Sequence, residues 1–388
     1  MDKVSPSPKT HSIAGAARRG YNATGAIPRT NMTQHTRRDF HMAAAGLVAA
    51  ALPSAPASRA SLSGLARPPM KWGIKHSMQI SDLEPRTLQL ARQLGMEYVN
   101  IWSSPAKYRD IVKTVEGAGL KVAKIGNGGV HNVAAITLGL PGRDEKIEEF
   151  KQNLRALASA GIRTQLYAHM ANGVWSTANE TNRGGAICRA FDETKPPTAA
   201  GSSHNGPFER LYTEDELWRN WEYFVRQIVP VAEETGVKIG VHPDDPPGLT
   251  LGNVPRPIFS SFEGYRRALE IANSPNVGMG LCVGCWLEGG ERMGRNVLDT
   301  IEYFGGLKKL FVVHFRNVGS PLPHFYETYL NEGYMDMYKV MRALRKVNFE
   351  GVLLGDHFPR MAAEGPAAQV YTLGYLQALI ERANEELL

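Results

Sequence analysis

Four side chains in the C-terminal half of the chain have the types expected of ligands to a metal ion. They are His242, Cys282, His314 and Asp356. Two imidazoles, a thiolate and a carboxylate suit a divalent transition ion and leave coordination positions for substrate and water. Any one of them alone would more often be a buried structural residue. Their intervals of 40, 32 and 42 residues each match the length of one strand and one helix, so the set favours a common site.

The elements that would position these donors alternate regularly along the chain. Eight short apolar runs have the composition of strands buried on both faces. They lie at residues 71–77, 98–103, 121–127, 163–170, 238–243, 277–284, 307–316 and 351–357. A helical pattern follows each run, at residues 85–95, 108–120, 145–161, 213–236, 262–273, 296–305, 335–348 and 370–387. Eight such units predict an α/β fold, a (β/α)8 TIM barrel, whose strands would bring the four donors to one mouth.

The barrel is expected to be a single domain over residues 67–388 with one extended loop after the fourth strand. This connection, at about residues 172–211, is polar and rich in glycine. A connection of that length is usually functional or disordered. We expect a lid or rim over the barrel mouth, or an unstructured stretch in its portion 199–205.

The segment HPDDPP places two aspartates next to the first donor. Pro243, Pro246 and Pro247 restrict the backbone of the turn that presents the histidine. Asp244 and Asp245 would then support the metal ligand or bind sugar hydroxyl groups, although solvated turn residues are the plainer alternative. His169, at the end of the fourth predicted strand, is a further candidate for substrate binding.

Cys282 and Cys285 form a C-x-x-C pair, which could also be a redox couple or half of a zinc site. The sequence has only one other cysteine, Cys188, so no second pair completes a structural zinc site. A redox role needs a thioredoxin-like context that eight strand–helix units do not provide. We expect Cys282 to be a ligand and Cys285 its neighbour, which an oxidising compartment could link.

The positive net charge of the chain belongs to its N-terminal part. Residues 1–71 contain 10 of the 44 Lys and Arg and 2 of the 38 Asp and Glu, which leaves 34 against 36 in the rest. A slightly acidic body does not support nucleic-acid binding. The sequence also lacks an apolar run long enough for an integral membrane segment.

The leader, residues 1–66, resembles a twin-arginine export signal. It contains Arg37 and Arg38, an Ala-rich apolar stretch at 42–52, and small residues before a possible cleavage site at Ala57 or Ala60. The true start could be Met1 or Met32. The signal predicts a periplasmic or otherwise exported protein, whereas a plain basic tail would leave the protein cytoplasmic.

Several motifs of the body resemble the mannonate dehydratase family, whose members are xylose-isomerase-like barrels. They are HPDDPP, GLCVG, VHFRN, HFYETYLNEGYMDMYKVMRAL and the DH pair at the last predicted strand. The resemblance runs from about Trp72 to the C-terminus. It implies dehydration of D-mannonate to 2-keto-3-deoxy-D-gluconate, with a small sugar acid as the binding partner.

The resemblance also implies roles for individual residues. The four donors would hold a divalent ion, with Mn²⁺ expected first and Fe²⁺ or Mg²⁺ as alternatives. His357 and Tyr371 would transfer protons beside the ion, with Asp356 counted among the catalytic groups. Arg316 and His131 would lie nearer the substrate.

Two other functions remain open at this point. The same barrel and metal could serve a sugar isomerase or epimerase, which conserves the mass of its substrate. An exported sugar-acid binding protein would bind its ligand without turnover. The sequence also leaves open whether the chain forms a homo-oligomer.

Overall fold

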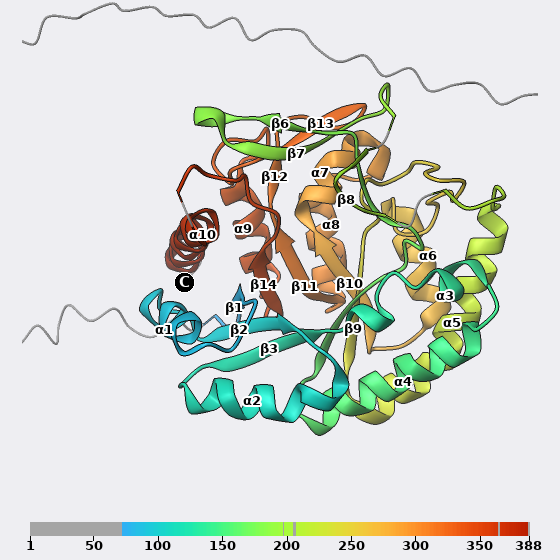
Figure 1. Cartoon of the computed structure of the whole chain (residues 1–388), viewed down its shortest axis with the longest axis horizontal. Helices are drawn as coiled ribbons and strands as arrows, with labels where there is room; N and C mark the ends of the chain where they lie inside the picture. The colour runs from blue at the N-terminus through green and yellow to red at the C-terminus, as the bar shows by residue number, and fades with distance from the viewer. Residues whose placement is uncertain (1–71, 197, 205–206, 364, 387–388) are drawn as a thin grey trace, which may run out of the picture. The chain divides into compact units, whose positions relative to one another are not determined.

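The computed structural model of the chain describes residues 72–196, 198–204, 207–363 and 365–386 (Figure 1). The predicted leader of residues 1–66, with its twin-arginine-like motif, lies outside the described residues. Within the part of the chain that the structure describes, no helix is both long and apolar enough to cross a bilayer.

Eight parallel strands form the central sheet and confirm the predicted barrel. Their order is β3-β2-β1-β14-β11-β10-β9-β4. They are β1 (Lys75–Gln79), β2 (Tyr98–Trp102), β3 (Lys121–Gly126), β4 (Thr164–Ala168), β9 (Lys238–His242), β10 (Val277–Cys282), β11 (Leu310–Phe315) and β14 (Val352–Gly355). The two end strands, β3 and β4, pack against each other, and the Asn132 N–H donates to the Ala168 carbonyl at 3.1 Å beyond their ends. The barrel is therefore nearly closed.

Eight helices of the described residues match the eight predicted helical patterns and surround the sheet (Figure 1). They are α1 (Pro85–Gln93), α2 (Tyr108–Gly117), α4 (Arg143–Ser159), α5 (Glu214–Thr235), α6 (Phe262–Ala272), α8 (Val297–Gly306), α9 (Met337–Lys346) and α10 (Ala367–Glu386). Shorter helices lie in the connections, at α3 (Ala134–Leu138), α7 (Val283–Gly289), Pro105–Lys107, Gly128–Val130, Arg183–Gly185 and Gly290–Met293.

The local sequence explains where α5 begins, ends and packs. Thr213 and Glu216 form a capping box, in which the Glu216 N–H donates to Thr213 Oγ1 at 3.3 Å and the Thr213 N–H donates to Glu216 Oε2 at 2.8 Å. The helix stops at Gly236, whose φ of 66° is left-handed. Its inner face buries Trp221 and Phe224 completely. Burial of a side chain such as Phe224 stabilises the fold by about 1.5–3 kcal/mol.

The insertion predicted after the fourth barrel strand is present, but it is built from strands. They are β5 (Gly173–Ser176), β6 (Ala178–Thr181), β7 (Ile187–Asp192) and β8 (Thr198–His204), the last in the portion weighed as unstructured. β7 pairs antiparallel with β13 (His324–Thr328), and together with β6 and β12 (Asn317–Val318) they form the cap sheet, in the order β12-β13-β7-β6. Because β12 directly follows β11, the cap sheet lies at the C-terminal end of the barrel strands (Figure 1). Local patterns miss this pairing because the partner of β7 comes from a distant part of the chain.

Candidate metal and substrate site

The structure brings the four predicted metal donors together at the ends of four neighbouring strands. His242 ends β9, Cys282 ends β10, His314 lies on β11 and Asp356 follows β14. One ligand atom from each residue lies within 4.8 Å of the others. The ring centroids of the two histidines are 5.0 Å apart. Because these strands are consecutive in the sheet, intervals of one unit in sequence become one converging set in space.

The ring nitrogens of the two histidines fit the requirements of a metal ligand. The Nδ1–H of His242 donates to the Pro243 carbonyl at 2.7 Å, which leaves the lone pair of a neutral ring on Nε2. Both ring nitrogens of His314 are buried without a hydrogen-bond partner, although Nδ1 lies 3.3 Å from Asp356 Oδ2. Buried polar atoms rarely lack a partner. A divalent cation bound among the donors would supply one.

Cys282 is held as a thiolate. Burial raises the pKa of its thiol, but hydrogen bonding from Cys285 and the positive charge of Arg316 outweigh burial and hold the pKa well below its usual value. The Cys285 backbone N–H also donates to Cys282 Sγ at 3.5 Å, so the side chain caps α7. This cap ends the predicted strand 277–284 at Cys282, two residues early. A β-carbon at Gly284 would overlap the Arg316 side chain, so glycine allows the guanidinium its close approach.

Cys285 has a different environment. Burial and the neighbouring Cys282 raise the pKa of its thiol well above the usual value. Its sulfur lies 3.3 Å from Arg316 Nη2. All three cysteines are free. The geometry therefore favours Cys282 as the ligand and Cys285 as a neutral neighbour.

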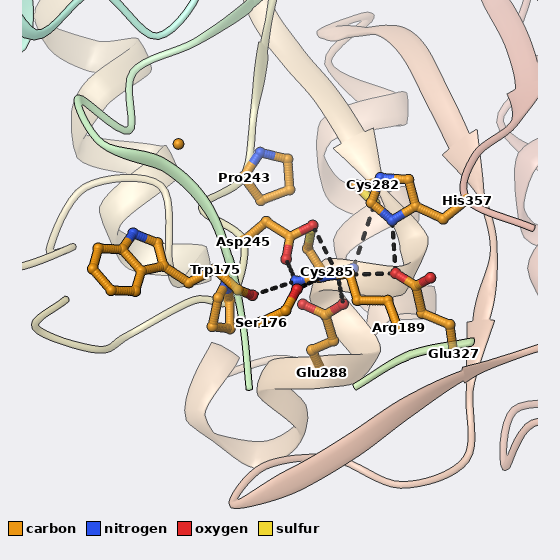
Figure 2. Close-up of polar contacts among 12 residues, drawn as sticks. Trp175, Ser176, Arg189, Pro243, Asp245, Cys282, Cys285, Glu288, Glu327 and His357 are labelled. Atoms are coloured by element: carbon orange, nitrogen blue, oxygen red, sulfur yellow. Dashed lines mark hydrogen bonds and ion pairs between the residues drawn. The ribbon is translucent and has the colours of Figure 1, made fainter. Parts of the chain in front are cut away.

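A buried network of charged side chains lies next to the donors (Figure 2). Arg316 donates to Glu288 Oε1 at 2.6 Å and to Asp245 Oδ2 at 3.0 Å. Arg189, from β7 of the cap sheet, contacts Asp245 and donates to Glu327 Oε1 at 2.9 Å (Figure 2). Although Arg316 pairs with it, burial raises the pKa of Glu288 to about 8, so this carboxyl is mostly protonated at neutral pH. The network joins the cap sheet to the barrel.

Replacement of Arg189 with methionine is expected to destabilise the protein by about 3–5 kcal/mol, because it removes one of the cations that balance the buried carboxylates of Asp245 and Glu327. Arg189 is 8% exposed and also donates to the Trp175 carbonyl and to Ser176 Oγ, both at 3.0 Å. Urea unfolding measures the loss. The exposed Arg183 of the same insertion is the matched control. If Arg183→Met and Arg189→Met unfold at the same urea concentration, the network does not hold the cap sheet.

His357 lies beside the donors and faces the same cavity. Its Nδ1 hydrogen-bonds to Glu327 Oε1 at 2.6 Å, and its Nε2 lies 3.7 Å from Asp356 Oδ1. Burial lowers the pKa of the ring, but the two carboxylates outweigh burial and raise it to about 10. The backbone of His357 has a φ of +43°, a conformation that non-glycine residues rarely adopt. Such positions persist where the surroundings hold them and often belong to functional sites.

A cavity of about 880 Å³ opens next to the donors. His314, Asp356 and His357 line it, together with residues at the ends of β1, β2 and β3 and at the start of α10. A cavity of this size, with a few converging polar groups, suits a small molecule. The donors and the cavity therefore form one candidate active site.

The structure places three predicted site residues away from this cavity. Tyr371 is 38% exposed on α10 and packs against Tyr329, with ring centroids 5.6 Å apart. His169 is buried among aromatic rings and its Nδ1 hydrogen-bonds to the Tyr167 hydroxyl at 2.7 Å. Asp244 is buried and accepts a hydrogen bond from its partner hydroxyl, Ser260 Oγ, at 2.8 Å. In this structure these contacts serve the fold, and His169 also packs against Trp221 and Phe224 of α5.

The remaining predicted substrate contacts lie around the donors but do not line the cavity. Arg316 and Asp245 are almost fully buried and are paired with each other. His131 packs edge-on against Trp102, with ring centroids 5.2 Å apart, and burial lowers the pKa of its ring to about 3. The charges of Arg316 and Asp245 can therefore affect the electrostatic potential at the donors without contact to a molecule in the cavity.

Sequence reasoning missed four charged residues of the site: Lys124, Arg189, Glu288 and Glu327. One signal was available for three of them. Each of Lys124, Arg189 and Glu327 is a charged residue within a strand-like run, in KVAKIG, ICRAF and HFYET, although Lys121 also precedes Lys124 in the first of these. A charged residue in such a position is rarely buried unless it is paired or functional.

The chain is similar in sequence to mannonate dehydratases. A family model described as D-mannonate dehydratase (UxuA) matches residues 88–195 and 207–385. The mannonate dehydratase of Thermotoga neapolitana is 31% identical over 276 residues, which cover 63% of this chain and 75% of that protein. The mannonate dehydratase of Streptococcus agalactiae serotype Ia is 30% identical over 280 residues, which cover 66% of this chain and 78% of that protein.

Solved structures show the same relationship. The mannonate dehydratase from Streptococcus suis serotype 2 superposes with a TM-score of 0.71 at 27% identity and covers 81% of this chain and 94% of that chain. An L-ribulose 3-epimerase superposes with a TM-score of 0.52 at 14% identity, covering 80% of this chain and 95% of that chain, which supports the barrel fold alone. Since the family model spans most of the barrel and its donors, this chain belongs to the D-mannonate dehydratase family.

Proposed function

We propose that this protein removes water from D-mannonate, giving 2-keto-3-deoxy-D-gluconate, with the help of a divalent metal ion. The observation that carries the proposal is the convergence of four metal donors beside a cavity that fits a sugar acid. Membership of the family supports the choice of substrate.

We propose Mn²⁺ as the ion, with Fe²⁺ as the closest alternative. His242, Cys282, His314 and Asp356 supply two nitrogens, one sulfur and one carboxylate. Mg²⁺ is less suited because it prefers oxygen ligands, and only one of these four residues offers oxygen.

The reaction removes the proton at C2 of the substrate and the hydroxyl group at C3. It therefore needs one group that accepts a proton and one that donates a proton. A bound divalent ion would stabilise the negative charge that develops beside the substrate's carboxylate as the C2 proton leaves.

We assign to His357 the donation of a proton to the departing hydroxyl group. Its hydrogen bond to Glu327 fixes the ring, and the neighbouring carboxylates keep the ring protonated. Its Nε2 lies 3.7 Å from Asp356 Oδ1, and both residues line the cavity. Tyr371 receives no step in this arrangement because it lies outside the cavity lining.

The experiment is to incubate the reduced, manganese-loaded full chain with D-mannonate and to follow the mass of the substrate. Loss of one water molecule that stops after EDTA treatment is the expected result. An unchanged substrate mass together with a new sugar isomer would replace the dehydratase with an isomerase or epimerase. A rise in Tm without any product would indicate a binding protein.

A further inference from the structure

Lys124 is a buried cation on the wall of the cavity. It lies on β3, is 2% exposed, and lines the cavity together with Trp102. Its Nζ lies 5.8 Å from the centre of the Trp102 ring. Lys124 forms no hydrogen bond or ion pair with any residue that the structure describes. Burial of a charge without a partner costs folding free energy, so a buried lysine of this kind indicates a functional role.

Among the described residues, no unengaged carboxylate lines the cavity beside Lys124. Of the described residues that line the cavity, only Asp356 is acidic. Asp356 is already engaged, with its Oδ2 at 3.3 Å from both His314 Nδ1 and Arg316 Nε. Burial lowers the pKa of Lys124 to about 8 while the charge of Asp356 opposes this, so the ammonium group stays mostly charged at neutral pH.

The strand order places Lys124 across the barrel from His314. β3 is separated from β11 by β2, β1 and β14, which is half of the way around eight strands, whereas only β4 lies between β3 and β9. The donors occupy β9, β10, β11 and the end of β14. The cavity therefore has His314 and Asp356 on one side and, across from them, the ammonium group of Lys124.

A second cation lines the same cavity. Arg360 is exposed, and its guanidinium makes no hydrogen bond or ion pair with the described residues, while its backbone pairs with that of Ile187. D-mannonate has one carboxylate, which the proposed reaction directs toward the donors. Lys124 and Arg360 would therefore have no anionic partner on D-mannonate.

We propose that Lys124 binds a second negatively charged group at the far end of the substrate, so that the protein prefers six-carbon sugar acids with an anionic group at C6. The group would be a carboxylate, as in D-mannarate, or a phosphate ester, as in 6-phospho-D-mannonate. A lysine ammonium is a point charge and can pair with either anion. This inference rests on the proposed dehydration and specifies its substrate class.

The test compares kcat/KM for D-mannonate, D-mannarate and 6-phospho-D-mannonate in the manganese-loaded full chain. Wild-type protein is expected to favour at least one of the two dianions over D-mannonate. Lys124→Met should lower kcat/KM for that dianion by about 10- to 100-fold, the range for a charged hydrogen bond, and should lower kcat/KM for D-mannonate, which has no anionic group at C6, by a clearly smaller factor. Lys124→Arg should restore part of the loss.

The matched control is Lys121→Met on the same strand. Lys121 is paired with Glu97 at 2.6 Å and its side chain is 62% exposed. This variant should behave as wild type with all three substrates. Lys124→Met should keep or raise the Tm, because it removes a buried unpaired charge; a purely structural lysine would give a lower Tm instead.

Two results would overturn the inference. One is an equal loss for all three substrates in Lys124→Met, which would place Lys124 at the carboxylate that they share. The other is a wild-type preference for D-mannonate that the substitution leaves unchanged. If no substrate loses water, the proposed reaction fails, and the rise in Tm with each compound tests the anion subsite by itself. A larger rise in Tm with a dianion, absent in Lys124→Met, would support the subsite. Equal rises in Tm with all three compounds would reject it.

Discussion

Replacement of His314 with alanine is expected to remove bound metal and turnover together. His314 contributes two buried ring nitrogens that lack a hydrogen-bond partner, at the centre of the four donors. Loss of residues that merely support a metal ligand costs about 10–100-fold in affinity, so loss of a ligand should cost at least about 100-fold. Metal content after dialysis and the rate of water loss from D-mannonate are the two measurements.

His324→Ala is the control for this substitution. His324 lies in the cap sheet, its side chain is 41% exposed, and it pairs with Glu180 at 2.7 Å. It should retain both metal and turnover. A His314→Ala protein that binds the usual amount of manganese would exclude His314 from the ligand set, and retained turnover would exclude a metal at these donors from the reaction.

Replacement of His357 with asparagine is expected to leave the metal content close to normal and to lower turnover by about 10²–10⁴-fold, the range for loss of a general acid or base. His357 is not one of the four clustered donors, but it lines the cavity beside Asp356. Asparagine is the suitable replacement because it tolerates the positive φ at this position better than most residues do.

Metal content and the urea midpoint of His357→Asn must be measured beside the rate. If both are unchanged and the rate falls, the residue acts on the substrate. A rate within about threefold of wild type would remove His357 from the mechanism. A fall in rate together with a loss of metal would reassign it to support of Asp356.

The regular spacing of the donors explains why the barrel and the metal cluster could be predicted. A barrel of parallel strands converts one strand–helix interval into one step around the sheet, so His242, Cys282 and His314 had to meet if the strands were assigned correctly. The same argument could not place Tyr371 or His169. Tyr371 lies within α10 and His169 follows β4, both correctly predicted elements, but the direction of each side chain depends on tertiary packing that the local pattern does not describe.

The charged network depended on pairing between distant segments. Arg189 reaches Asp245 and Glu327 only because β7 pairs with β13, which follows β11 in the chain. Simple alternation could not place Lys124 either. The register of β3 against β2 shifts between Val122 and Lys124, so Lys121 pairs with Tyr98 and Lys124 pairs with Asn100. The two lysines therefore lie on one face of the sheet although they are three residues apart, and the local pattern carries no signal for such an irregularity.

The cap sheet determines the route by which a sugar acid reaches the donors. Its strand β7 is tied to buried carboxylates of the barrel through Arg189, and none of its described residues lines the cavity. The cavity is instead bordered by Ser81, Trp102 and the segment that leads into α10. We therefore expect substrate entry and product release on the side of β1 and β2, without an opening of the cap sheet.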